Sequence, residues 1–139
     1  MIMKKIYSKV NPKLLILTLF KINDLKNDRI NLSPDNEIIQ ASCQKLKKGF
    51  EVAPHKHINK VRNTNETQEA WIVLRGKIEG EFFDLDDKSI FKCELCFGDC
   101  IVVYRGGQRL KVLEDNTIFY EFKNGPYFGA HEDKIDIVI

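Results

Sequence analysis

The stretch that decides the fold is GFEVAPHKH (49–57), followed after a polar loop by EAWIVLRG (69–76). Side chains alternate between the two faces of a β-strand, so His55 and His57 share one face if the first stretch is a strand. Glu69, which opens the next strand, can reach the same point. Two neutral imidazoles and a carboxylate bind Zn²⁺, Fe²⁺, Mn²⁺ or Ni²⁺ and leave positions open for water or substrate. We therefore predict one divalent metal ion held by these three side chains.

The remaining sequence predicts short strands separated by turns. Apolar or alternating runs occupy residues 13–22, 37–46, 50–57, 69–74, 77–84, 89–94, 100–104, 108–113 and 117–123. Turn residues such as Asp86-Asp87 and Gly106-Gly107 lie between them, and only residues 23–29 suit a short helix. Many short strands at close spacing predict an all-β, antiparallel sandwich or barrel in a single domain.

The composition excludes several classes of function. The net charge of +2 predicts neither nucleic-acid binding nor a membrane contact. The longest apolar run, at 14–20, is far shorter than the roughly 20 residues that span a bilayer, and no signal peptide is visible, so we expect a cytoplasmic protein. Cys93 and Cys96 suit a zinc or redox pair poorly, and we expect all four cysteines to be small, buried or half-buried residues.

The spacing around the histidines resembles the first motif of the cupin superfamily, which is Gly, five residues, His-x-His, a gap, Glu, six residues and Gly. The matching positions are Gly49, His55, His57, Glu69 and Gly76, with a longer gap than usual at 58–68. The resemblance implies a jelly-roll β-barrel, the double-stranded β-helix, over the whole of residues 1–139. It would have an N-terminal strand and connecting segment at 1–32, a barrel core at 33–125 and a C-terminal tail and strand at 126–139.

The second cupin motif is degraded in this chain. Gly98 and Gly106 match its glycines, but Tyr104 replaces the usual proline, and Arg109 stands where the family has its fourth ligand, a histidine. A shift of one residue places Gln108 there instead. Arginine does not coordinate metals, and a glutamine carbonyl is a weak, hard donor. Two alternatives stay open: Gln108 is a weak fourth metal ligand, or the metal is lost and Arg109 or Gln108 binds a polar ligand directly.

Residues 33–139 are also similar to small single-domain cupin-fold metalloproteins encoded among surface-polysaccharide genes, a resemblance that implies a fold and a site but no substrate. The similarity is carried by residues 54–57, 73–76, 121–127 and 132–134. A sugar or nucleotide-sugar ligand is expected from the residues themselves, because an aromatic ring can lie against a sugar with amide and basic groups around it. Polar and aromatic residues predicted to contact that ligand are Gln40, Gln44, Trp71, Tyr104, Arg109, Tyr120 and Lys123. For the aromatic residues the alternative is core packing, and for the glutamines and Lys123 it is a solvent-facing position.

Three functions compete at this point. The first is a metal-dependent enzyme acting on a small polar metabolite, the second a metal-free nucleotide-sugar epimerase or isomerase, and the third a non-catalytic carbohydrate-binding module. We also predict a homodimer, because apolar segments at 14–20 and 135–139 lie outside the motif-bearing strands and would leave exposed strand edges in a monomer.

Overall fold

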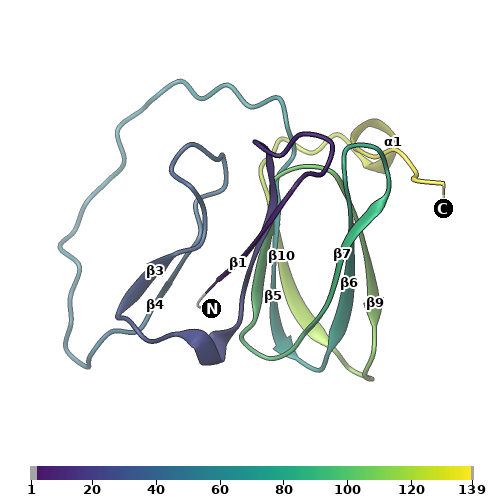
Figure 1. Ribbon diagram of the computed structural model, residues 1–139. Coiled ribbons are helices and arrows are strands. Elements are labelled where there is room, and N and C mark those ends of the chain that lie inside the picture. Colours follow the sequence, from purple (N-terminus) through teal and green to yellow (C-terminus); the bar gives the residue numbers. More distant parts are fainter. Residues whose placement is uncertain (1–2, 139) are drawn as a thin grey trace.

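The computed structural model describes residues 3–138 as a small single domain built mainly of β-strands (Figure 1). The strands are β1 (Lys4–Tyr7), β2 (Leu15–Phe20), β3 (Arg29–Asn31), β4 (Ser42–Gln44), β5 (Glu69–Arg75), β6 (Ile78–Phe83), β7 (Ser89–Leu95), β8 (Cys100–Val103), β9 (Gly107–Val112) and β10 (Ile118–Lys123). The helical elements are one 3-10 turn, η1 (Ile22–Asp24), and one short helix, α1 (Ala130–Asp133).

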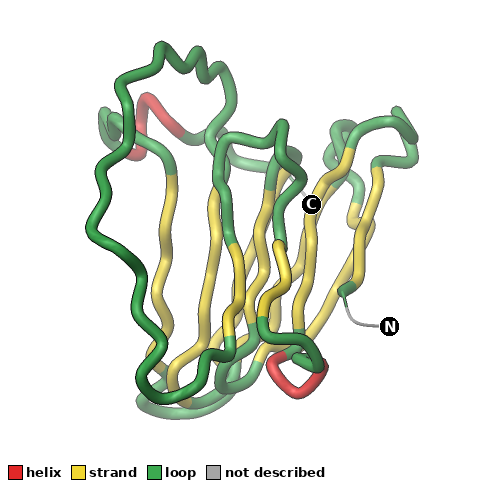
Figure 2. The backbone as a smooth tube through the Cα atoms, turned by 90° about the vertical axis from the view of Figure 1, so that its left-hand side faces the viewer, coloured by secondary structure: helices red, strands yellow, loops and turns green. Residues whose placement is uncertain are grey.

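The strands form three antiparallel sheets. One has five strands in the order β1-β2-β8-β5-β10, one has three in the order β7-β6-β9, and β3 pairs with β4 in a separate hairpin. The five-stranded sheet lies between the other two (Figure 1), and Figure 2 views the same layers one behind another. Within residues 3–138 the sheets do not close into a barrel, because β9 and β10 each pair with one neighbour only. The antiparallel all-β prediction is therefore confirmed, and the closed jelly roll is not observed.

Both faces of the five-stranded sheet are buried at its centre. On β5, Trp71 and Val73 point toward the three-stranded sheet, and the Trp71 ring lies 5.7 Å from the ring of Phe82 on β6. Ala70, from the same strand, points the other way and joins the cluster under the β3–β4 hairpin. Strands covered on both faces have continuous apolar sequences, which explains the LILTLF of β2 and the CIVV of β8.

The turn from β5 into β6 requires a glycine. Gly76 has a φ of +75°, a conformation that L-residues adopt rarely. A Cβ at this position would also lie 2.9 Å from the Cα of Thr117, which precedes β10. This glycine therefore allows the chain to reverse and β10 to lie beside β5.

Several predicted elements differ from the observed ones. Residues 45–68 contain no strand, so the predicted strand at 50–57 is absent, and the segment 37–46 contributes only β4. The segment 37–46 forms a shorter strand than predicted because the backbone N–H groups of Ile38 and Ile39 donate to Oε1 of Gln68 instead of to a neighbouring strand. The predicted helix at 23–29 is the 3-10 turn η1, and β1 and β3 were not predicted. Residues 134–138 form no strand, and Ile139 lies outside the described residues.

Candidate functional site

A cavity of about 460 Å³ opens between the two larger sheets, at the end where β5 begins and β10 finishes. Its walls are strand ends of both sheets and the C-terminal segment after α1. The polar and charged residues that line it are Thr67, Glu69, Arg105, Gln108, Arg109, Lys123, Asn124, Asp133, Lys134 and Asp136. Four predicted site residues therefore come together here: Glu69, Gln108, Arg109 and Lys123.

Glu69 is the buried carboxyl of this cavity. It is the first residue of β5 and is 7% exposed, and the indole N–H of Trp71 donates a hydrogen bond to it. Burial raises the pKa of the Glu69 carboxyl, and the nearby carboxylate of Glu121 raises it further, against the lowering effect of the hydrogen bonds from Trp71 and Gln108. The cavity thus contains an acid that holds its proton more tightly than an exposed glutamate does.

Gln108 and Lys123 supply the neutral and cationic groups of the wall. Oε1 of Gln108 is buried and has no hydrogen-bond partner among the described residues. Nζ of Lys123 lies 4.5 Å from the centre of the Tyr127 ring and 3.5 Å from a carboxylate oxygen of Glu121. Arg109 lies at the rim, half exposed, where its guanidinium pairs with Glu81. An unpaired buried acceptor beside a cation and an aromatic ring suits a small polar molecule.

The predicted metal ligands do not converge in this structure. His55 and His57 lie in the exposed loop 45–67, with their ring centres 5.7 Å apart, and Nδ1 of His55 lies 3.0 Å from the carbonyl oxygen of Ala53. Glu69 is in the cavity instead. Among residues 3–138 no three His, Cys, Asp or Glu side chains are placed to hold a metal ion. The three-ligand set is therefore not assembled in this conformation, because residues 50–57 are not a strand.

The other residues predicted to contact the ligand lie away from the cavity. Trp71 and Tyr104 are core residues, and the Tyr104 hydroxyl hydrogen bonds to Thr18 and to the carbonyl of Leu32. The remaining three are placed as follows: the Gln40 amide donates to the carbonyls of Pro34 and Glu37, Gln44 is exposed on β4, and Tyr120 is 56% exposed on the outer face of β10 beside Phe122.

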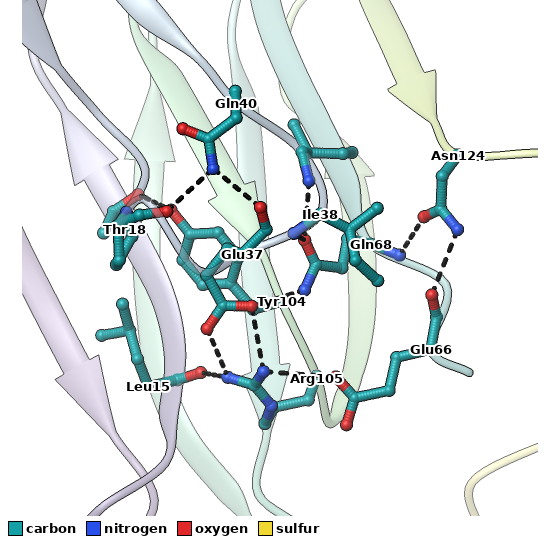
Figure 3. Close-up of polar contacts among 12 residues, drawn as sticks. Leu15, Thr18, Glu37, Ile38, Gln40, Glu66, Gln68, Tyr104, Arg105 and Asn124 are labelled. Carbon is teal, nitrogen blue, oxygen red and sulfur yellow. Dashed lines mark hydrogen bonds and ion pairs between the residues drawn. The ribbon is translucent and has the colours of Figure 1, made fainter. Parts of the chain in front are cut away.

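Arg105 is a cavity residue that the motif argument missed. Its guanidinium makes two hydrogen bonds of 3.0 and 3.1 Å to the carboxylate of Glu37 and one of 3.2 Å to Glu66 (Figure 3). The Arg105 side chain is 13% exposed and that of Glu37 is 7% exposed, so this ion pair is largely buried. Burial lowers the pKa of the Arg105 guanidinium, but the hydrogen bonds and charges of these two carboxylates outweigh it, so the pKa is raised. The available signal in the sequence was a charged residue two positions after the apolar strand β8 and directly before Gly106-Gly107.

Gln68 completes the same network. Its Nε2 donates to Glu37 at 2.6 Å, and its backbone N–H donates to Oδ1 of Asn124 at 2.7 Å. The Asn124 amide in turn donates to the carbonyl of Glu66. We call these five residues, Glu37, Glu66, Gln68, Arg105 and Asn124, the anchor cluster. It ties segments before and after the loop to the ends of β8 and β10 (Figure 3).

The cysteines form no disulfide in this structure. Cys100 is buried, which raises its thiol pKa to about 12, and the half-buried Cys93 has a pKa raised to about 11. Cys43 is half buried and Cys96 is exposed. Raised thiol pKa values make a poor nucleophile or metal ligand at neutral pH, because the thiolate is the reactive form.

Comparison with models of known protein families, with curated proteins and with solved structures gave no match. The likeness to cupins therefore rests on the motif spacing in the sequence. No helix in residues 3–138 has the length and apolar character needed to cross a membrane.

Proposed function

We propose that the cavity binds a small polar metabolite that carries a negative charge, of the sugar or nucleotide-sugar class, in a domain of the cupin type. The observation that carries this proposal is the buried, unpartnered Oε1 of Gln108 in a cavity that also contains Lys123. A buried acceptor without a partner is unfavourable by about 1–3 kcal/mol, so a ligand hydroxyl or amide that donates to it gains that free energy.

The neighbouring side chains indicate which other chemical groups the ligand carries. Lys123 supplies a charge for a phosphate or carboxylate, and the Tyr127 ring offers an apolar face for a sugar ring. Glu69, whose pKa is raised, can accept or donate a hydrogen bond to a sugar hydroxyl. Binding does not require turnover, and the same groups serve a carbohydrate-binding module.

Metal binding by His55, His57 and Glu69, with Gln108 as a weak fourth ligand, is a second proposal. The motif spacing supports it, and a bound divalent ion would polarise oxygen atoms of the ligand as a Lewis acid. It requires the loop that carries the histidines to reach the cavity wall, because the described conformation keeps them apart. A metal-free isomerase that uses a histidine base has the same requirement.

The binding proposal is tested by calorimetric titration with UDP-glucose, dTDP-glucose and the free sugars. Lys123→Met should weaken binding of the charged ligands by tenfold or more, since a hydrogen bond to a charged group contributes about 1.5–3 kcal/mol. Lys111→Met is the matched control, because Lys111 is exposed on β9 and does not line the cavity. Equal affinities for both variants, or no binding by the wild type, would exclude this site. Elemental analysis of the purified protein tests the metal proposal separately.

A further inference from the structure

The outer edge of β9 is unpaired and lies beside the cavity. β9 has six residues, and β6 is its single neighbour in the described structure. Its Gly107, Gln108 and Arg109 line the cavity. An unpaired edge presents a row of N–H and C=O groups to which another strand can add. Such a strand would form a further wall of the cavity.

The same chain carries a segment with the properties of an added strand. Residues 45–67 are all exposed, and they include Phe50 and Val52, each 61% exposed, and Val61, which is 93% exposed. Within residues 3–138, residues 51–65 make one hydrogen bond, which joins His55 to the carbonyl of Ala53 in the same segment. Exposed apolar side chains on an unpaired segment of this length indicate a surface that a partner covers.

The middle of this segment lies away from the β9 edge of its own molecule (Figure 1), although Thr67 at its end lines the cavity. At one end, the N–H of Lys45 donates to the carbonyl of Asp28 beneath the hairpin. At the other, Glu66 is fixed by Arg105 and by the Asn124 amide in the anchor cluster. Between these points the loop runs out past the β3–β4 hairpin, on the opposite side of the five-stranded sheet from β9 (Figure 1).

Symmetry favours a second copy as the partner. Each copy has both an unpaired β9 edge and an unpaired segment, so a reciprocal contact between two copies covers both segments through one two-fold axis. Charge does not select the partner, because residues 45–62 are basic and the cavity behind β9 contains four cationic side chains besides its three carboxyls.

We propose that residues 52–57 of one molecule add as a strand to the β9 edge of a second copy, and that the exchange is reciprocal. The exchange brings His55 and His57 of one copy to Glu69 and Gln108 of the other, and this consequence rests on the metal proposal above. The metal site is then shared between two chains, and a single chain lacks it. The conformation of the isolated chain is the one that presents the segment to its partner.

The position of Pro54 defines which residues pair. Proline has no N–H, so an edge strand accepts it only where that position faces solvent. The backbone N–H and C=O groups of successive residues in a strand point in opposite directions. Those of Val52 and Pro54 therefore point to solvent, and those of Ala53, His55 and His57 pair with β9. Ala53→Pro should therefore break the added strand, and Val52→Pro should leave it intact.

The first experiment measures mass in solution by light scattering at micromolar concentration. The wild type and Val52→Pro should be dimers and Ala53→Pro a monomer. Native fluorescence of the buried Trp71 checks that all three variants are folded. A monomeric wild type, or an Ala53→Pro variant that dimerises like Val52→Pro, would overturn the exchange.

The second experiment mixes two variants that each lack half of the site. His55→Ala/His57→Ala and Glu69→Gln should each fail to bind Zn²⁺ in a competitive chelator titration. After unfolding and refolding together, random pairing should restore about a quarter of the wild-type sites. Zn²⁺ binding by a wild-type monomer would overturn the exchange and leave the metal proposal intact. A dimer that responds to Ala53→Pro while no protein binds Zn²⁺ supports the exchange and removes the metal proposal.

Discussion

Replacing Arg105 by methionine tests whether the anchor cluster holds the fold together. The change removes the partner of the Glu37 carboxylate, whose side chain is 7% exposed, and leaves it with the single donor Nε2 of Gln68. Removing one member of a buried ion pair destabilises a protein by about 3–5 kcal/mol. Because Arg105 keeps 13% of its side chain exposed, we expect a loss of about 3 kcal/mol in the free energy of unfolding. That is a large part of the roughly 5–15 kcal/mol of a typical domain.

The assay is urea unfolding followed by the fluorescence of Trp71, which is 2% exposed in the folded protein. The matched control is Lys88→Met, which removes an equally charged residue from an exposed pair with Asp86 and should not change the midpoint. Glu37→Gln in the Arg105→Met background should destabilise the protein further by much less than it does in the wild type, because the two residues are coupled. An Arg105→Met midpoint equal to that of the control would refute the structural role of the pair.

Three further outcomes are expected. A maleimide at about pH 8 should label exposed Cys96 and spare Cys100, whose pKa is raised to about 12 by burial; equal labelling rates would contradict that burial. Glu69→Gln should raise the melting temperature at neutral pH, because the raised pKa of Glu69 means that folding disfavours its charged form. The gain in melting temperature should vanish below the ordinary pKa of 4.5, where Glu69 is protonated in both the folded and the unfolded protein. A gain that does not depend on pH would argue against a raised pKa of Glu69. Gly76→Ala should lower the free energy of unfolding by more than about 1 kcal/mol, since its φ is +75° and Thr117 blocks a Cβ; an unchanged urea midpoint would disprove this.

Strands with neighbours on both sides were predicted well from the sequence. The apolar runs of β2 and β8 and the mixed run of β5 have high strand propensity, and both faces of each are covered, so local preference and packing agree. β1 and β3 were not predicted because Lys4–Tyr7 and Arg29–Asn31 are short and half polar. Each adopts the strand conformation because it pairs with a neighbouring strand. Pairing partners of that kind are not visible in a local window.

The candidate site was predicted in part for a similar reason. Glu69, Gln108 and Lys123 come together because the strands that carry them are long and paired, so their face is determined by alternation. His55 and His57 lie on a segment with no paired neighbour in the described structure. For such a segment, the alternation of side chains along the sequence does not determine where they lie in space. Motif spacing indicates which residues belong together, and the neighbouring strand decides where they lie.

One set of hydrogen bonds accounts for two differences from the expected barrel, namely the missing strand at 50–57 and the open sheets. Gln68 accepts from the N–H groups of Ile38 and Ile39, and Arg105 holds Glu37, so the segment 37–40 is attached to the end of β8. These N–H groups are then not available to a strand beside β10, and the chain that follows leaves the sheet on its outer side (Figure 2). In the described conformation the loop that starts there lies on the far side of the five-stranded sheet from β9 (Figure 1). The molecule therefore has an open β9 edge and an unpaired segment at the same time, which is the combination that strand exchange between two copies requires.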